Sequence, residues 1–330
     1  MKFIDKKLSS FDIKAHSLRG KNFFSGILDF REKIFDSNKN RIKEPKDFIC
    51  SLCQSSDANL FLEWRDGYEL YKCNACSAVS PNISVENTSE HVDQVYNNDI
   101  YYDKFLKEIH AHFDYRKNLF GSQRYEYIFD RLNLDPQKIN LLDVGCGAGY
   151  FLSYLHDKNI NYKGLEVNKL QVKYCQELGL NVASNDLEAE NDESYDVIVM
   201  LDVLEHLFQP VSVFETAKKK LKKNGYIIAY TPNIHSVAYE LMGSEQNTLL
   251  PFEHLCFYNQ QSIAYLAKMT GLNLYSLETF GLDMMDYLLM KEYKDQYPYT
   301  EKLHDMMVVV QACLDKLEVS NHFRITLHNK

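Results

Sequence analysis

Two spacings of apolar residues divide most of the chain into strands and helices. Residues 139–146 (INLLDVGC) and the apolar core of residues 192–207 form continuous runs, which are typical of buried parallel strands. In residues 150–158 and 168–180 the apolar positions recur at helical spacing, and Gly179 closes the second of these helices. Because such strands and helices alternate along the chain, we expect a parallel sheet with helices on both faces.

Further segments complete the predicted sheet. The expected order is a second strand at 161–167, a third strand and loop at 181–190, a helix at 210–225 ended by Gly225, a fifth strand at 226–233, a sixth at 272–280 and a last, antiparallel strand at 320–330. Residues 281–318 between the last two strands have a helical pattern, which Tyr297-Pro298-Tyr299 divides into two helices.

Four cysteines near the N-terminus form a metal-binding pattern. Two C-x-x-C pairs, Cys50/Cys53 and Cys73/Cys76, flank an alternating segment that turns at Arg65-Asp66-Gly67, a hairpin signal. Two such turns joined by a hairpin resemble a zinc ribbon with tetrahedral thiolate coordination of a structural Zn²⁺. Gln54 and Ser77 follow the second cysteines, where ribbons usually carry glycine, and iron remains an alternative metal.

Composition and charge narrow the classes of function. The 330 residues are 45% hydrophobic and 25% charged, no apolar run is long enough to span a bilayer, and the start lacks an apolar signal region, so we expect a cytoplasmic protein without membrane insertion. The formal net charge is −9, with an excess of positive charge confined to residues 1–50. This acidic body disfavours nucleic acid as a partner.

A glycine-rich turn follows the first buried strand, in residues 141–155 (LLDVGCGAGYFLSYL). The spacing is Asp143-x-Gly145-x-Gly147-x-Gly149, and missing Cβ atoms between a strand and a helix let a ligand approach the backbone closely. Dinucleotide sites instead use G-x-G-x-x-G. A carboxylate before the glycines favours a ligand with positive charge and repels a pyrophosphate.

This turn resembles the first motif of class I S-adenosylmethionine (SAM) methyltransferases, D/E-x-G-x-G-x-G, and the likeness extends over roughly Tyr96 to Lys330. The resemblance implies an α/β, Rossmann-like, doubly wound seven-stranded sheet with SAM as the cofactor. It also implies a cofactor site that contains Asp143 and Asp202. In that site Tyr101 would contact the SAM carboxylate, and the methionine portion would lie along Gly145, Gly147 and Gly149. Glu166 would bind the ribose, and Asp186 with Leu187 the adenine.

Two segments offer a base for the reaction. Residues 251–259 (PFEHLCFYN) resemble the E-H-L-x-Y-F segment of small-molecule methyltransferases, among them sugar C-methyltransferases with an N-terminal zinc segment, which implies His254 as base and Glu253 as its assistant. Residues 202–207 (DVLEHL) add His206. If that turn continues as a helix, Asp202, Glu205 and His206 share one face. With His254 they could then hold a divalent cation, a possibility that the sequence leaves open.

The resemblance implies an enzyme that methylates a small polar acceptor, a sugar or nucleotide sugar, at oxygen or carbon, in the synthesis of surface polysaccharides or secondary metabolites. An RNA methyltransferase that grips RNA with the ribbon, and a non-catalytic scaffold with a SAM fold, are the alternatives. The expected organisation is an N-terminal extension (1–45), a ribbon segment (46–92) and a methyltransferase domain (93–330), whose helical insertion, about 282–318, is a candidate for acceptor or homodimer contacts.

Overall fold

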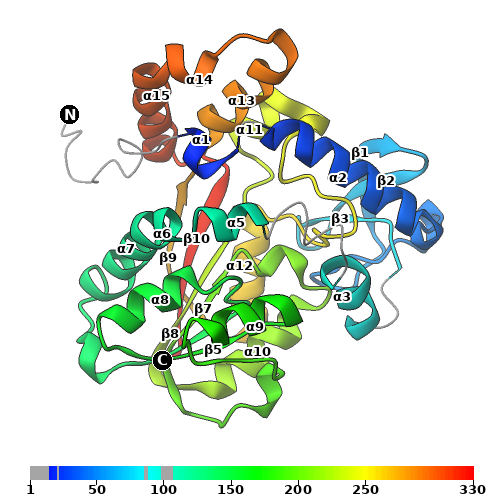
Figure 1. Cartoon of the computed structure of the whole chain (residues 1–330). Coiled ribbons are helices and arrows are strands. Elements are labelled where there is room, and N and C mark those ends of the chain that lie inside the picture. Colours follow the sequence, from blue (N-terminus) through cyan, green and yellow to red (C-terminus); the bar gives the residue numbers. More distant parts are fainter. Residues whose placement is uncertain (1–14, 21, 85–87, 98–106) are drawn as a thin grey trace.

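The computed structural model describes residues 15–330 except for residues 21, 85–87 and 98–106. Two sheets organise these residues (Figure 1), one of seven strands and one of three. No helix among the described residues is long and apolar enough to cross a membrane.

The seven-stranded sheet has the order β6-β5-β4-β7-β8-β10-β9. Its strands are β4 (Asn140–Val144), β5 (Asn161–Leu165), β6 (Val182–Ala183), β7 (Tyr195–Leu201), β8 (Leu221–Pro232), β9 (Asn273–Phe280) and β10 (His322–His328). Strands β4 to β8 pair in parallel, whereas β10 pairs antiparallel with both β8 and β9. The predicted doubly wound, Rossmann-like sheet with a single antiparallel strand is therefore confirmed.

Alternate residues of the central strands point into two different cores. Leu141, Val197 and Val199 face a core shared with α8 and α9, whereas Leu142 and Ile198 face a core shared with α10 and α12. The two faces of the sheet are therefore both buried, which explains the continuous apolar runs of the central strands. The helices of the domain are α5 (Lys107–Ala111), α6 (Phe113–Arg116), α7 (Ser122–Tyr125), α8 (Tyr150–Asp157), α9 (Lys169–Glu177), α10 (Pro210–Lys220), α11 (Val237–Met242) and α12 (Gln260–Thr270).

The three-stranded sheet is the predicted ribbon. It contains β1 (Ala58–Arg65), β2 (Tyr68–Cys73) and β3 (Val79–Pro81), and β1 turns into β2 at Asp66 and Gly67, which both have positive φ. Figure 1 shows these strands beside α2 (Phe23–Asn38), with α1 (Ala15–Leu18) before it and α3 (Thr88–Tyr96) after the ribbon. Buried ribbon residues belong to the same core as α10 and α12, so the ribbon is packed against the seven-stranded sheet and its helices.

The predicted helical insertion lies between β9 and β10. It comprises α13 (Asp283–Asp295), a short α14 (Tyr299–Lys302) that begins just after Pro298, and α15 (His304–Leu317). Figure 1 shows these helices gathered at one end of the large sheet, close to α11 and α1. His322, the first residue of β10, pairs with Pro232, the last residue of β8, so the insertion returns to the edge where the parallel strands end.

The structure differs from the predicted elements in three places. The helix predicted to end at Gly225 ends at Lys220, and Gly225 lies within β8, where a Cβ atom would approach the backbone oxygen of Asp196 to 2.9 Å. The third strand is only Val182–Ala183. The turn after β7 does not continue as an α-helix, because Asp202 has φ of 60° and a single 3₁₀ turn, η8 (Leu204–His206), follows.

Candidate active site

The glycine turn connects β4 to α8 and has the conformation that its sequence requires. Gly145, Gly147 and Gly149 have φ of 73°, 56° and 76°. A Cβ atom at Gly145 would lie 2.5 Å from Val203, and one at Gly149 would lie 2.8 Å from both Cys175 and Leu180. At Gly147 the nearest atom is 3.9 Å away. Two of the glycines are therefore fixed by packing, whereas Gly147 leaves its space open to a ligand.

We expect substitutions at Gly147 and Gly149 to have different effects on folding stability and on SAM affinity. Gly147→Ala should cost about 1 kcal/mol of folding free energy, because alanine is strained at positive φ. It should also lower SAM affinity more than tenfold, which corresponds to a loss of about 1.4 kcal/mol in binding free energy. Gly149→Ala adds steric overlap inside the core, and should lower the melting temperature further. Thermal denaturation and calorimetric SAM titration of both variants measure the two effects. Equal loss of stability in both would contradict the assignment.

Two buried carboxyl groups lie next to this turn. Glu166, after β5, accepts hydrogen bonds from the backbone N–H groups of Gly147 (2.8 Å) and Asn168 (2.7 Å). Asp143 is 3% exposed, and its Oδ1 atom has no hydrogen-bond partner among the described residues. Burial raises the pKa of Asp143 to about 7, although the positive charge of Arg124 opposes the shift. A carboxyl group with a free oxygen in this position suits a cationic ligand.

The raised pKa of Asp143 predicts a pH-dependent stability. An unfolded aspartate loses its proton near pH 4, whereas the folded one holds it up to about pH 7. The folded state therefore binds more protons in this window, and the stability of the ligand-free protein falls as pH rises through it. Asp143→Asn should remove this loss, so its melting temperature should exceed that of the natural protein above about pH 7. Parallel thermal scans from about pH 4 to pH 8 test the sign.

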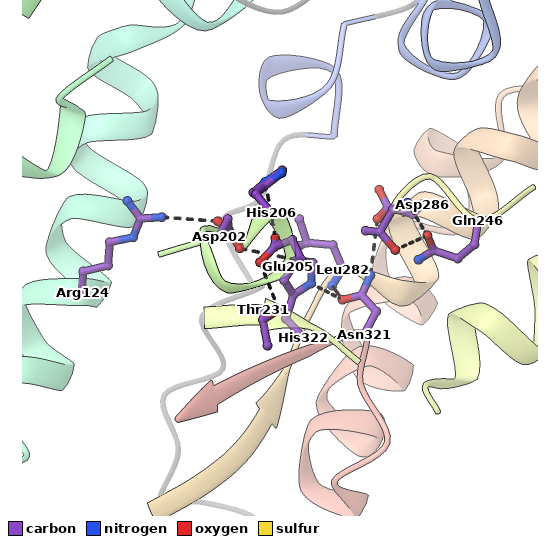
Figure 2. A network of polar contacts seen from close by, with 11 residues as sticks. Arg124, Asp202, Glu205, His206, Thr231, Gln246, Leu282, Asp286, Asn321 and His322 are labelled. Atoms are coloured by element: carbon purple, nitrogen blue, oxygen red, sulfur yellow. Dashed lines mark hydrogen bonds and ion pairs between the residues drawn. The ribbon is translucent and has the colours of Figure 1, made fainter. Parts of the chain in front are cut away.

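The other residues expected in the cofactor site differ in burial and in position. Asp186 is exposed at the start of a 3₁₀ turn, and the next residue, Leu187, is buried in the core. Asp202 directly follows β7 and lies 3.9 Å from Arg124 and 3.7 Å from His322, as Figure 2 shows. Tyr101 lies outside the described residues. The adenine and carboxylate contacts of SAM therefore stay predictions.

The structure brings the two candidate base segments together. The rings of His206 and His254 are 4.7 Å apart between centroids and nearly perpendicular. Nδ1 of His206 lies 3.0 Å from the backbone oxygen of Glu253 and 2.6 Å from the hydroxyl of Tyr96. Glu205 accepts a hydrogen bond from Thr231 (3.0 Å), and its other carboxylate oxygen is 3.9 Å from Nε2 of His206 (Figure 2).

Burial sets the protonation of this cluster. It lowers the pKa of His206 to about 4 and that of His254 well below the usual histidine value. Burial also raises the pKa of Glu253 to about 8. Near neutral pH both imidazoles are therefore neutral, and each keeps one nitrogen lone pair that can accept a proton or bind a metal ion. Nδ1 of His254 and Oε2 of Glu253 have no hydrogen-bond partner among the described residues.

Several residues that contact this cluster could not be identified from the sequence. Tyr96, Thr231 and His322 contact its members although they lie far from them along the chain. His322 also contacts Asn321, which in turn lies 3.5 Å from Asp286 of α13. One feature of the sequence did point to His322: it lies at the start of the predicted antiparallel strand, and this start lies at the edge of the sheet where the parallel strands end.

The four ribbon cysteines converge on one point. Their sulfur atoms all lie within 4.8 Å of one another, with Cys50 and Cys76 3.5 Å apart and Cys53 and Cys73 3.4 Å apart. Zinc–sulfur bonds of about 2.3 Å in a tetrahedron place sulfurs about 3.8 Å apart, so the four thiols fit a tetrahedral zinc ion. Gln54 and Ser77 have φ of 60° and 64°. They adopt the left-handed conformation that glycine usually provides in such turns.

The ribbon also holds the segment that carries Glu253 and His254. Val79 of β3 and Phe257 exchange both backbone hydrogen bonds, at 3.0 and 2.7 Å. On the opposite side, the backbone oxygen of Glu205 accepts from the N–H groups of Leu255 (2.7 Å) and Cys256 (3.1 Å). Helix α2 packs in one core with the ribbon and with residues 249–257. The position of His254 therefore depends on the ribbon, on α2 and on the turn after β7.

Known proteins resemble the part of the chain that contains this site. Residues 115–277 match the family described as "Methyltransferase domain". This segment includes the glycine turn, Glu166, His206 and the Glu253-His254 pair, whereas the four ribbon cysteines, α13–α15 and β10 lie outside it.

The chain also resembles curated relatives and solved structures. A ubiquinone biosynthesis O-methyltransferase of Rickettsia typhi is 32% identical over 126 residues, which are 35% of this chain and 51% of that protein. The enzyme of the same name from Chromobacterium violaceum is 27% identical over 173 residues, 48% of this chain and 74% of that protein. The chain spans about half the length of the first of these relatives. A SAM-dependent methyltransferase from Archaeoglobus fulgidus has 20% identity, a TM-score of 0.46 and coverage of 64% and 94%.

Proposed function

Because residues 115–277 are a class I, SAM-dependent methyltransferase domain, we propose that the protein transfers the methyl group of SAM to a hydroxyl group of a small polar acceptor. We further propose that this acceptor is a sugar or a nucleotide sugar. The observation that carries the proposal is that one matched segment contains both the open glycine turn and the histidine cluster. The names of the relatives support oxygen as the methylated atom.

The donor half of the reaction rests on the charge around the glycine turn. SAM carries a positive sulfonium and an ammonium group, and Oδ1 of Asp143 beside the turn lacks a hydrogen-bond partner among the described residues. Binding of a cation would favour the ionised form of Asp143 and so recover part of the free energy that burial of this carboxyl group costs. Glu166 holds the turn through Gly147 and keeps further lone pairs for ribose hydroxyls.

The acceptor half rests on buried polar atoms near the histidines. Besides Nδ1 of His254, three side-chain atoms of the segment 246–254 are buried without a hydrogen-bond partner among the described residues: Gln246 Nε2, Asn247 Oδ1 and Glu253 Oε2. Leaving such an atom unpaired costs roughly 1–3 kcal/mol. An acceptor with several hydroxyl groups would supply partners for these atoms, and a purely apolar acceptor would not.

We propose that His254 takes the proton from the acceptor hydroxyl, with Glu253 as its assistant and His206 beside it. Methyl transfer from a sulfonium is an in-line displacement, in which the enzyme orients the acceptor and removes its proton. His254 is suited to this step because burial keeps its imidazole neutral near pH 7. Glu253, whose pKa is raised to about 8, is largely protonated there and can donate a hydrogen bond to the acceptor.

A panel of acceptors tests this proposal. Purified protein is incubated with SAM carrying a labelled methyl group and with nucleotide sugars, free sugars or catechols, and the label in each product is counted. We expect transfer to a sugar-containing acceptor and none to catechols. Transfer to catechols alone would reject the sugar acceptor and leave methyl transfer standing, whereas SAM binding without transfer to any acceptor would favour a scaffold.

A further inference from the structure

We propose that Glu205, His206 and His254 bind one divalent transition-metal cation, at a site separate from the four cysteines, and that the acceptor hydroxyl occupies an open position on this cation. The inference rests on the proposed function only for the role of the acceptor. Metal binding itself follows from the donor atoms and stands or falls independently of methyl transfer.

The donor atoms converge. One ligand atom from each of these three residues lies within 4.8 Å of the other two. Glu205 is 2% exposed and His254 is 5% exposed, whereas the side chain of His206 is partly open, at 23%. Movements of about 1 Å would bring all three atoms to bonding distances near 2.0–2.2 Å around one ion. The partial exposure of His206 gives an ion and a second molecule a way to the site.

Contacts around the cluster orient the ligands as metal sites require. The backbone oxygen of Glu253 at 3.0 Å favours a proton on Nδ1 of His206, and this tautomer leaves the lone pair on Nε2, toward Glu205. The hydroxyl of Thr231 binds one oxygen of Glu205 and leaves the other free for a ligand. Ligating histidines commonly have a backbone carbonyl, and ligating carboxylates a hydrogen-bond donor, in these places.

The charges of the cluster also favour a cation. Glu205 and Glu253 are both buried, and within the described ranges neither forms an ion pair with lysine or arginine. Buried acidic groups in proteins are usually paired with a cationic side chain or bound to a metal ion. A divalent cation between Glu205 and the two histidines would be the partner that the described lysines and arginines do not provide.

The donor set indicates which cations fit. Two imidazoles and one carboxylate suit Mn²⁺, Co²⁺ or Zn²⁺ better than Mg²⁺, which prefers oxygen ligands. Three protein ligands leave positions open for the acceptor. A hydroxyl on the cation loses its proton to water more readily. Its oxygen then forms a bond to the methyl carbon while the sulfur–carbon bond breaks and its electron pair returns to sulfur. In this form His254 is a metal ligand, and the cation takes over the activation of the hydroxyl.

Manganese binding tests the inference. Mn²⁺ is a poor match for four thiolates, so protein that retains its ribbon metal can be titrated with Mn²⁺ while the electron paramagnetic resonance signal of free Mn²⁺ is recorded. We expect about one bound Mn²⁺ per chain, as for a single site. Glu205→Gln and His254→Asn should each weaken this binding at least tenfold, in line with the loss of one ligand. Glu215→Gln removes an exposed carboxylate of α10 and should change nothing.

Thermal denaturation distinguishes a variant that has lost its metal ligand from a variant that does not fold. Glutamine can still accept the hydrogen bond of Thr231, so Glu205→Gln should melt near the natural protein without metal. On addition of Mn²⁺ the natural protein and Glu215→Gln should gain several degrees, whereas Glu205→Gln should not. The inference is overturned if Mn²⁺, Co²⁺ and Zn²⁺ show no binding beyond the ribbon metal, or if Glu205→Gln binds Mn²⁺ as the natural protein does. Either result would leave methyl transfer from SAM intact, because SAM binding is measured separately.

Discussion

Replacing Cys73 by serine should lower the melting temperature by about 10 °C or more and abolish methyl transfer, although Cys73 lies outside the glycine turn and the histidine cluster. Structural zinc contributes folding free energy directly, on the order of 10 kcal/mol in small zinc-binding peptides. In this chain Cys50, Cys73 and Cys76 also belong to the core shared with α10 and α12. We propose that a zinc ion occupies the four thiols, and we therefore expect its loss to damage more than the ribbon.

The physical link to activity runs through the segment after His254. Phe257 pairs with Val79 of β3, and Ser51 between the first two cysteines donates a hydrogen bond to the backbone oxygen of Leu255 (3.0 Å). A ribbon that loses its metal would release these contacts and with them the position of His254.

The matched control is Cys313→Ser, which removes an exposed thiol of α15 and should leave metal content, melting temperature and transfer unchanged. Metal content by mass spectrometry, thermal denaturation and labelled-methyl transfer are the readouts. A Cys73→Ser protein that retains both its fold and its activity would contradict the role of the ribbon.

His254→Asn should reduce methyl transfer by a factor of about 10²–10⁴, because it removes the group that takes the acceptor proton or holds the proposed cation that activates the hydroxyl, while SAM affinity stays unchanged. Asparagine keeps a polar group in the buried space but has no lone pair of comparable basicity. Because His254 is 5% exposed and lies against His206 rather than at the glycine turn, its loss should act on the acceptor step alone.

Transfer rates and calorimetric SAM affinities are compared for His254→Asn and for His304→Asn, a change at an exposed histidine of α15 that should affect neither quantity. Loss of SAM binding in His254→Asn would place the residue in the donor site instead. Full activity in this variant would remove it from the mechanism.

The sequence predicted the structure well wherever a local pattern of residues determines the backbone conformation. The strand–glycine–helix order, the two C-x-x-C pairs and the Asp66-Gly67 hairpin each predict a structure that forms. The lysine-rich residues 218–223 show where local patterns mislead. They have helical composition, yet Leu221 pairs with Tyr195 and the chain is already in β8, because pairing with β7 outweighs local propensity.

Contacts between distant segments could not be predicted in the same way. The sequence suggested a helical face that joins Asp202, Glu205 and His206. In the structure Asp202 has positive φ and faces Arg124 and His322, whereas Glu205 turns inward to Thr231. The proximity of His206 to His254 follows from the pairing of residues 255–257 with the ribbon and with Glu205. Such proximity depends on packing between elements, and no spacing along the chain encodes it.

The choice of ligand at the glycine turn is the central claim, and calorimetric titration tests it most directly. Natural protein and Asp143→Asn are titrated with SAM, with S-adenosylhomocysteine and with NADH. The account predicts micromolar binding of the first two ligands to the natural protein, weaker binding to Asp143→Asn, and no detectable binding of NADH, on the order of the affinities usual for such cofactors. Tight binding of NADH together with indifference to both adenosyl ligands would contradict it.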